Sequence, residues 1–345
     1  MKANAVTLTS RPLQAHRSRH ARGNGRLQVD VLFSEPLRDT LARDVVRGLG
    51  SWPKVLPPKY FYDDRGSALF DAICDLPEYY LTRVSHELLA IHADDIVAVS
   101  HPREIIELGS GSARKTRVLL SALARRNGRF RYLPFDVSEG TLRRAAVELM
   151  DEYPMLSIHA MVGDYERDLE RLPPGQHRLV LFLGSTIGNF TPAATADFLA
   201  RLRAQLSPGE HLLIGTDLVK APAILEAAYN DSAGVTAEFN RNVLHVINDQ
   251  LDGDFEPERF AHVAFFNQTR SQIEMHLRAR TAQTVSIRAL DLTIDFAAGE
   301  MIHTEISRKF TREEVELGLD AAGFQLLRWY TPSNNFFALA LAGAV

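Results

Sequence analysis

The sequence contains very little cysteine, since Cys74 is the only one in 345 residues. A single cysteine excludes an intrachain disulfide and a cysteine-rich metal knuckle, so a reducing, cytoplasmic compartment is the simplest expectation. The sequence also lacks an apolar run of about 18 residues, and we therefore expect no membrane span. Its charge is nearly balanced, with 39 Lys and Arg against 43 Asp and Glu. Without a basic excess, nucleic acid is not an expected partner.

Metal-binding patterns are missing as well. The twelve histidines form no HExxH motif and no paired spacing with carboxylates, so we predict no metal site. The first 26 residues contain arginines and a lysine but no acid. We interpret residues 1–27 as a disordered basic tail, although an organelle transit peptide has a similar composition.

The remaining composition is that of a globular protein, with 46% hydrophobic and 24% charged residues. From Arg103 onward, apolar runs alternate with amphipathic stretches. Strands are predicted at 104–109, 131–136, 156–162, 178–184 and 211–217, and helices at 115–126, 139–153 and 194–206. Continuous apolar strands that alternate with helices indicate an α/β fold with a parallel sheet covered on both faces.

The C-terminal part of the sequence predicts a helix at 311–323 and two further strands at 324–330 and 336–342. Only five residues join these two strands, which favours a hairpin and therefore an antiparallel last strand. Residues 219–308 break the alternation and contain the segments 273–279 and 284–290, in which polar and apolar residues alternate. We interpret this region as part of a second, smaller α/β domain.

A glycine loop follows the first predicted strand, in the sequence ELGSGS at 107–112. Gly109 and Gly111 allow a sharp turn and a close approach of the backbone to a ligand. Arg114 occupies the position of the third glycine of the dinucleotide fingerprint, which disfavours NAD and FAD. A Gly-x-Gly loop of this kind is common in enzymes that use S-adenosylmethionine (SAM), but it is also compatible with a purely structural turn.

Two acidic residues and a lysine lie near the same predicted edge. Asp136 ends the second strand, where a carboxylate can accept hydrogen bonds from ribose hydroxyls, and Asp164 follows the third strand, where it can accept from the adenine amino group. Either one can instead be a helix cap or turn former. Lys115 begins the following helix, where it can pair with the carboxylate of the cofactor or remain solvated.

Several longer motifs carry a more specific signal. They are FYDDRGSALFDAICDLPEYYLTR (61–83), ELGSGSARKTRVLL (107–120), PFDVSEGTL (134–142), FLGSTIGNFTP (182–192), GTDLVK (215–220), AAYNDSAGVTAEFNRNVL (227–244), IEMHLRARTAQ (273–283) and TEISRKF (304–310). Together they resemble the histidine-specific, SAM-dependent methyltransferases, which trimethylate the α-amino group of L-histidine to hercynine in the first step of ergothioneine biosynthesis. The resemblance runs from about Val46 to Leu341.

The resemblance implies a role for each matching residue. It implies cofactor contacts at Gly109, Lys115, Asp136, Asp164 and Tyr165. It implies that Tyr79, Asn189 and Tyr229 hold the amino-acid end of the substrate, that Glu305 and Ser307 hold the imidazole with Met275 beside it, and that Tyr62 lies near the reacting amine. SAM is then the methyl donor and L-histidine the small-molecule partner.

The residue types at the imidazole end suit this chemistry. Glu305 and Ser307 are two apart, which on a strand places both on one face. A carboxylate accepts an imidazole N–H, and a hydroxyl can donate to or accept from the other ring nitrogen. Without the resemblance, a surface ion pair of Glu305 with Arg308 or Lys309 is the simpler explanation. Asn189 can likewise be a turn former, and Tyr79 and Tyr229 can be packing residues.

We therefore predict a class I, Rossmann-like methyltransferase domain at 86–218 and 309–345, with a substrate-binding domain at 28–85 and 219–308. We expect a monomer with the substrate in the cleft between the domains. Two other functions stay open, namely N-methylation of another amino acid such as a tryptophan derivative, and non-catalytic SAM binding. A histidine preference is favoured by Glu305 and Met275, because an indole offers only a donor and is bulkier.

Overall fold

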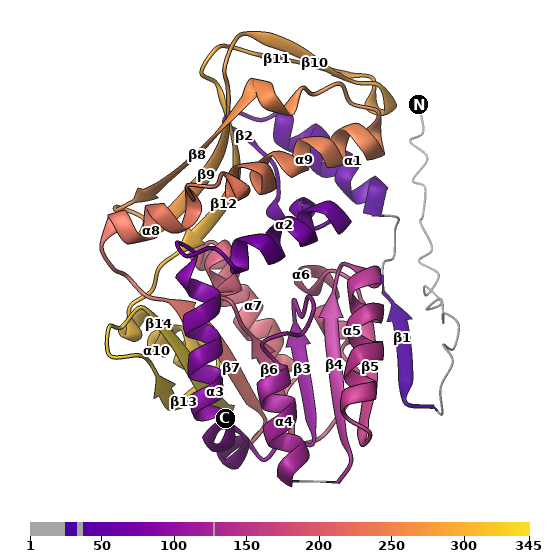
Figure 1. Cartoon of the computed structure of the whole chain (residues 1–345), viewed down its shortest axis with the longest axis vertical. Coiled ribbons are helices and arrows are strands. Elements are labelled where there is room, and N and C mark those ends of the chain that lie inside the picture. The colour runs from indigo at the N-terminus through magenta and orange to yellow at the C-terminus, as the bar shows by residue number, and fades with distance from the viewer. Residues whose placement is uncertain (1–24, 33–36, 127) are drawn as a thin grey trace, which may run out of the picture.

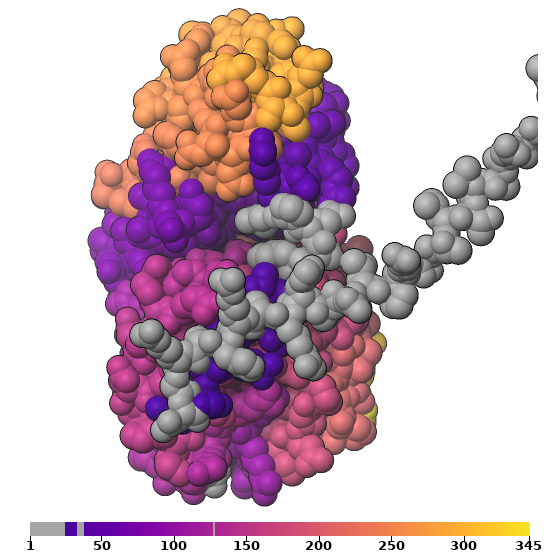
Figure 2. Space-filling model, turned by 90° about the vertical axis from the view of Figure 1, so that its right-hand side faces the viewer, coloured from indigo at the N-terminus to yellow at the C-terminus, as the bar shows by residue number. Residues whose placement is uncertain are grey.

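The structure is a computed structural model, and it describes residues 25–32, 37–126 and 128–345. It has two lobes (Figure 1). The lower lobe is a large sheet between helices, and the upper lobe combines helices with smaller sheets. Figure 2, turned by 90°, shows the upper lobe, with orange and indigo residues, directly above the magenta lower lobe.

The lower lobe is built on an eight-stranded sheet with the order β1-β5-β4-β3-β6-β7-β14-β13. Its strands are β1 (Leu27–Val31), β3 (Glu104–Leu108), β4 (Phe130–Asp136), β5 (Leu156–Val162), β6 (Arg178–Phe182), β7 (His211–Asp217), β13 (Phe324–Tyr330) and β14 (Phe337–Ala344). β14 runs antiparallel to both of its neighbours, β7 and β13, and the other strand pairs of this sheet are parallel. The strand order reverses at β3, and ligands bind beside such a point at the carboxyl edge of the sheet.

Helices cover both faces of this sheet. One core contains side chains of α3 (Tyr80–Ser100), α4 (Arg117–Arg126) and α5 (Glu139–Glu152). The other contains side chains of η2 (Leu169–Arg171), η3 (Thr186–Asn189), α7 (Pro192–Ala204) and α10 (Arg312–Ala321), with α6 (Tyr165–Asp168) packed against it. Every residue of β3 and β6 is buried, as strands covered on both faces require.

Helix termini carry the capping residues that the sequence indicates. The Ser138 hydroxyl accepts from the backbone N–H of Thr141 at the start of α5. Thr311 and Glu314 form a reciprocal capping box at the start of α10. Gly323 follows α10 with a φ of 84°, a left-handed conformation that glycine adopts without strain. These local signals explain why the helices begin and end close to their predicted bounds.

The upper lobe contains a four-stranded sheet in the order β2-β12-β9-β8 and a separate hairpin of β10 and β11. Its strands are β2 (Lys54–Val55), β8 (Phe260–Asn267), β9 (Gln272–Ala279), β10 (Gln283–Ile287), β11 (Leu292–Phe296) and β12 (Met301–Arg308). Its helices are α1 (Leu37–Leu49), η1 (Pro58–Phe61), α2 (Asp64–Cys74), α8 (Pro222–Tyr229), α9 (Val235–Leu251), η4 (Pro257–Arg259) and η5 (Arg288–Leu290). A third hydrophobic core lies among these elements.

The predicted fold class is confirmed, including the parallel sheet and the antiparallel last strand. One segment is placed differently. Residues 28–31 were assigned to the substrate-binding domain, yet β1 pairs with β5 in the large sheet. The predicted tail also ends earlier than expected, because Arg26 already donates to the carbonyl of Pro154 at 2.9 Å. The rest of that tail, residues 1–24, lies outside the described residues.

Within the described ranges, no helix combines the length and apolar character needed to cross a membrane.

Candidate active site

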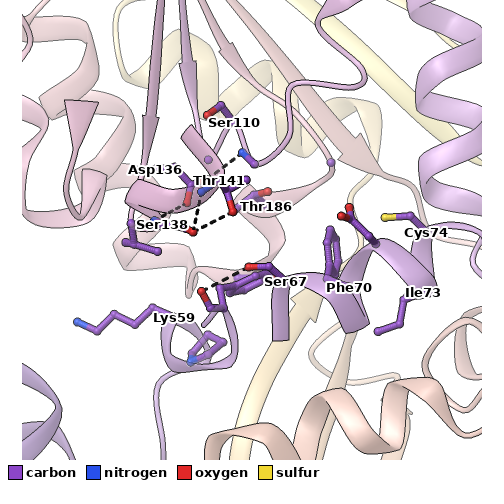
Figure 3. Close-up of a pocket in the computed structure, with 18 of the residues that line it drawn as sticks. Lys59, Ser67, Phe70, Ile73, Cys74, Ser110, Asp136, Ser138, Thr141 and Thr186 are labelled. Carbon is purple, nitrogen blue, oxygen red and sulfur yellow. Dashed lines mark hydrogen bonds between the residues drawn. The ribbon is translucent and has the colours of Figure 1, made fainter. Parts of the chain in front are cut away.

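A cavity of about 1150 Å³ lies at the carboxyl edge of the large sheet, between the two lobes. Figure 3 shows Ser110, Asp136 and Ser138 on the sheet side of this cavity and Phe70 and Cys74 of α2 on the opposite side. All twelve residues singled out from the sequence line it, namely Tyr62, Tyr79, Gly109, Lys115, Asp136, Asp164, Tyr165, Asn189, Tyr229, Met275, Glu305 and Ser307. The fold therefore brings together residues from both lobes.

The glycine loop after β3 forms one wall. Gly109 and Gly111 have φ angles of 71° and 49°, a region that other residues rarely adopt. The backbone N–H of Gly111 donates to Asp136 Oδ2 at 2.9 Å, and that of Ser138 donates to Oδ1 at 3.0 Å. Burial raises the pKa of Asp136, while these backbone donors oppose the shift. The loop thus holds a carboxylate in place at the cavity wall.

Asp164 and Tyr165 lie beside this loop. The Asp164 carboxylate accepts from the backbone N–H of Glu166 at 3.0 Å, so it caps α6 as well as lining the cavity. Lys59 of the upper lobe donates to the same carboxylate at 3.3 Å. The Tyr165 ring packs edge-on against Phe182, with centroids 5.6 Å apart. Lys59 was not predicted from the sequence, because nothing local marks it as a partner of Asp164.

Lys115 contributes a positive charge to the same wall. Its Nζ lies near the loop after β6, since a Cβ built on Gly184 would be 3.3 Å from it. Burial lowers the pKa of Lys115, and electrostatic interaction with the nearby Cys74 and Glu107 opposes this shift. Among the described residues, no carboxylate lies within ion-pair distance of Lys115. A partly buried cation without such a partner suits an anionic group in the cavity.

Glu305 is enclosed at the other end of the cavity. It is opposite Met275 in the register of β12 and β9, after a bulge between His303 and Glu305. Only 9% of Glu305 is exposed, and its carboxylate has no hydrogen-bond partner in the described part of the chain. Burial raises its pKa to about 7, against the charge of Lys309. The alternative of a surface ion pair with Arg308 or Lys309 is therefore wrong.

Ser307 belongs to a buried hydrogen-bonded group. The Tyr229 hydroxyl donates to Ser307 Oγ at 2.8 Å, and Lys309 Nζ donates to the same oxygen at 2.9 Å. Lys309 Nζ also lies 2.9 Å from Asp217 Oδ2, with both side chains fully buried. The structure thus connects Tyr229 directly to Ser307, whereas the resemblance assigned Tyr229 to the amino-acid end of the substrate.

Aromatic side chains form the middle of the cavity. The rings of Tyr79 and Tyr229 meet edge-on with centroids 6.2 Å apart, and Tyr62 meets Phe70 in the same way at 5.6 Å. Burial raises the pKa of both Tyr62 and Tyr79 well above the ordinary value, so their hydroxyls stay protonated at neutral pH. Asn189 ends the short helix η3 and is half-buried at the cavity wall.

Several residues around the cavity were missed by sequence reasoning. Asp217 and Lys309 lie in the motifs GTDLVK and TEISRKF, but their charges gave no sign of burial. Glu107, the last residue but one of β3, lines the cavity and accepts from the Tyr132 hydroxyl. Burial raises the pKa of Glu107 to about 7. A sequence shows which residues carry charge, but the partner that permits burial is visible only in three dimensions.

A second titratable cluster lies outside this cavity. Glu274, His276 and His303 each place one potential ligand atom within 4.8 Å of the others. The two histidines are opposite each other on β9 and β12, a pairing that spacing along the chain does not reveal. None of the three lines the cavity.

Comparison with known proteins gives a consistent result. A family model described as "Histidine-specific methyltransferase, SAM-dependent" matches residues 41–344. The chain is 49% identical over 313 residues to a histidine N-alpha-methyltransferase of Mycolicibacterium smegmatis, covering 91% of this chain and 98% of that protein. It is 31% identical over 303 residues to ergothioneine biosynthesis protein 1 of Neurospora crassa, covering 82% of this chain and 32% of that longer protein.

Among solved structures, a SAM-dependent methyltransferase from Clostridium acetobutylicum aligns with a TM-score of 0.44 at 10% identity, covering 79% of this chain and 97% of that one.

Proposed function

Because the chain belongs to the family of histidine-specific, SAM-dependent methyltransferases, we propose that it trimethylates the α-amino group of L-histidine. The product is hercynine, and the reaction is the first step of ergothioneine biosynthesis. The similarity to a histidine N-alpha-methyltransferase over nearly the whole of both chains supports this substrate. The similarity to an ergothioneine biosynthesis protein supports the pathway.

The hydrogen-bonding capacity of Glu305 and Ser307 is the observation that carries the choice of substrate. An ionised carboxylate only accepts hydrogen bonds, so Glu305 can bind an N–H group of the substrate. Ser307 Oγ already receives donors from Tyr229 and Lys309, so its own O–H is left to donate. A neutral imidazole offers one N–H and one bare nitrogen, which matches both groups. An indole has no bare nitrogen and leaves the Ser307 hydroxyl without an acceptor.

The opposite end of the cavity suits SAM. The turn at Gly109 and Gly111 lets the cofactor approach the backbone, and Asp136 is placed to accept hydrogen bonds from its ribose hydroxyls. Lys115 would pair with the carboxylate of its methionine part, since no protein carboxylate within ion-pair distance competes for it among the described residues. We assign contacts with the adenine to Asp164 and Tyr165. When bound, SAM supplies an electrophilic methyl group on a sulfonium.

The protein contributes mainly orientation to this reaction. Holding two reactants in line can lower a barrier by roughly 7 to 11 kcal/mol. We assign Tyr79, Asn189 and the ring of Tyr229 to the amino-acid end of histidine and Tyr62 to the amine, because the Tyr229 hydroxyl proton is already donated to Ser307. Because the Tyr62 hydroxyl stays protonated at neutral pH, it orients the amine as a neutral group, and water carries away the released protons.

The product carries a permanent positive charge on its α-nitrogen. The rings of Tyr62 and Tyr79 line the cavity and can attract such a cation with about 1 kcal/mol. The same rings exclude water, which helps to keep the amine in its reactive orientation.

Competition between amino acids tests this proposal. Purified protein and labelled SAM are incubated with equal concentrations of L-histidine and L-tryptophan, and separately with a panel of other amino acids. We expect transfer to histidine. Preferential labelling of tryptophan would indicate that the substrate is an amino acid with an indole ring. SAM binding without transfer to any amino acid would support a non-catalytic role.

The organisation of the chain is part of the proposal. We assign SAM binding to residues 86–218 and 309–345 and substrate binding to the upper lobe, within 37–85 and 219–308. We further propose that the protein acts as a monomer, since the twelve residues from both lobes line one cavity within a single chain. We also propose that it acts in the cytoplasm and without a metal ion. Sedimentation at working concentration tests the oligomeric state.

A further inference from the structure

A buried charged cluster lies directly behind the imidazole end of the cavity. Asp217 is its centre and is completely buried. Its carboxylate accepts from the Tyr80 hydroxyl at 2.8 Å and from Lys220 Nζ at 2.6 Å, and it pairs with Lys309 Nζ at 2.9 Å. Burying an ion pair is expensive unless its hydrogen bonds are satisfied. This cluster meets that condition, but the methyl-transfer chemistry itself makes no use of it.

The members of the cluster come from the places where the chain passes between the lobes. Asp217 ends β7 of the large sheet, and Lys220 precedes α8 of the upper lobe. Lys309 follows β12 of the upper lobe, and Tyr80 begins α3 of the lower lobe. The Asp217–Lys309 pair therefore attaches the end of β12, with Ser307 two residues earlier, to the rigid sheet below.

The contacts of Lys309 determine how Ser307 can bind a ligand. A hydroxyl oxygen has two lone pairs and one proton. Both lone pairs of Ser307 Oγ are occupied, one by the Tyr229 hydroxyl and one by Lys309 Nζ. Lys309 also donates to the Tyr229 hydroxyl at 3.2 Å, so that hydroxyl is itself kept as a donor toward Ser307. Ser307 can then only donate into the cavity.

We propose that Lys309, held by Asp217, is a positioning residue that fixes Ser307 as a hydrogen-bond donor and thereby makes the site select histidine with a neutral imidazole ring. This rests on the proposed function, because it concerns how that substrate is recognised. An imidazolium presents two N–H groups, of which Glu305 accepts one. The second N–H would face the Ser307 proton, and a buried donor without an acceptor is costly.

Other titratable groups surround this end of the cavity, and each limits how the test can be designed. Glu305 titrates with a pKa of about 7, and burial lowers the pKa of Lys220 to about 8. Burial acts to lower the pKa of Lys309, but the interactions with Asp217 and Tyr229 outweigh burial, so the pKa is raised. Further groups with raised pKa values are Tyr62, Tyr79, Tyr80, Tyr229 and Cys74. The pH dependence of histidine binding alone would therefore combine the titration of Glu305 with that of the imidazole.

A pair of ligands separates these contributions. The second ligand is 1,2,4-triazole-3-alanine, which has the same amino-acid end and a ring N–H but stays neutral across this pH range. Affinities for both are measured calorimetrically at pH 7.5 and 5.5 with S-adenosylhomocysteine bound. When both ligands bind as neutral rings, the ionisation of Glu305 affects them alike, and the ratio of the two affinities then reports the imidazole proton alone. An imidazole with a pKa near 6.5 should weaken histidine relative to the triazole by about tenfold over this range in the wild type.

Replacing Lys309 tests its part in this selection. In Lys309→Met, one lone pair of Ser307 becomes free and can accept the second N–H of an imidazolium. We expect the ratio in this variant to change by less than about twofold between the two pH values. Lys220→Met is the matched control, because Lys220 binds Asp217 without touching Ser307. It should keep the wild-type tenfold change, whatever its absolute affinity.

A second variant covers the case in which Lys309→Met does not fold. Ser307→Ala leaves the Asp217–Lys309 pair intact and removes the opposing proton, so its ratio should change with pH by less than the wild-type tenfold, because the bare nitrogen of the imidazole and the second N–H of the imidazolium are then both without a partner. A wild-type ratio that is already independent of pH would overturn the proposal, and so would a tenfold change that persists in the folded variants. Failure of the proposed function has a different signature, namely the absence of methylated histidine from the wild-type reaction.

Discussion

Glu305→Ala removes the side chain to which we assign the largest part in histidine recognition. Glu305 is 9% exposed and has no competing hydrogen-bond partner in the described part of the chain. A hydrogen bond to a charged group contributes about 1.5 to 3 kcal/mol. The variant should therefore bind histidine about 10-fold to 150-fold more weakly. Calorimetric titration of histidine into protein saturated with S-adenosylhomocysteine measures this directly.

The same variant should bind SAM as tightly as the wild type, because the residues assigned to SAM lie on loops of the other lobe. Glu274→Ala is the matched control, since it removes a carboxylate from the neighbouring strand β9 outside the cavity. Its histidine affinity should be unchanged. Wild-type histidine affinity in Glu305→Ala would refute the reasoning, and an equal loss of SAM affinity would point to a damaged fold instead.

Three further predictions concern the cofactor, stability and metals. Asp136→Ala should weaken SAM binding by tenfold or more, as measured by calorimetry, because it removes the carboxylate held by Gly111; unchanged affinity would exclude the ribose contact. Glu305 has a folded pKa of about 7, above that of an unfolded glutamate, so its ionisation destabilises the ligand-free protein as the pH rises from about 4.5 through 7. Glu305→Gln should therefore stabilise the protein at pH 8 by up to about 3 kcal/mol and little at pH 4, in melting curves across pH. A chelator should leave the methylation rate unchanged, because the Glu274, His276 and His303 cluster lies outside the cavity; a loss restored by a divalent metal would contradict this.

The large sheet could be predicted from the sequence because its strands are continuous apolar runs. β3 and β6 are buried at every residue, and such runs are recognisable without knowing their neighbours. The glycine loop was equally visible, since Gly109 requires a backbone conformation that few residues tolerate. Together these signals located the edge at which the cavity lies.

Other features depend on partners that are distant along the chain. The strand β1 was missed because a short segment has no marker of its edge position, and only its pairing with β5 identifies it. β8 and β12 were not delimited, because their faces are part apolar and part polar. Lys309 follows Arg308 in a stretch whose charges predict exposure to solvent. It is nevertheless only 1% exposed, because it forms a buried ion pair with Asp217.

The roles of the cavity residues came from the resemblance to a family and not from the residue types alone. Glu305 illustrates this, because a glutamate followed by Arg308 and Lys309 predicts a surface ion pair as readily as a ligand contact. Its burial beside Met275 and Ser307 excludes the surface ion pair, and the ligand contact stays a prediction.

Mass spectrometry of histidine incubated with the protein and excess SAM tests the central claim most directly. The account predicts a product that carries three added methyl groups, all of which fragmentation locates on the α-nitrogen. Methyl groups on a ring nitrogen, or unmodified histidine alongside SAM that the protein demonstrably binds, would contradict it.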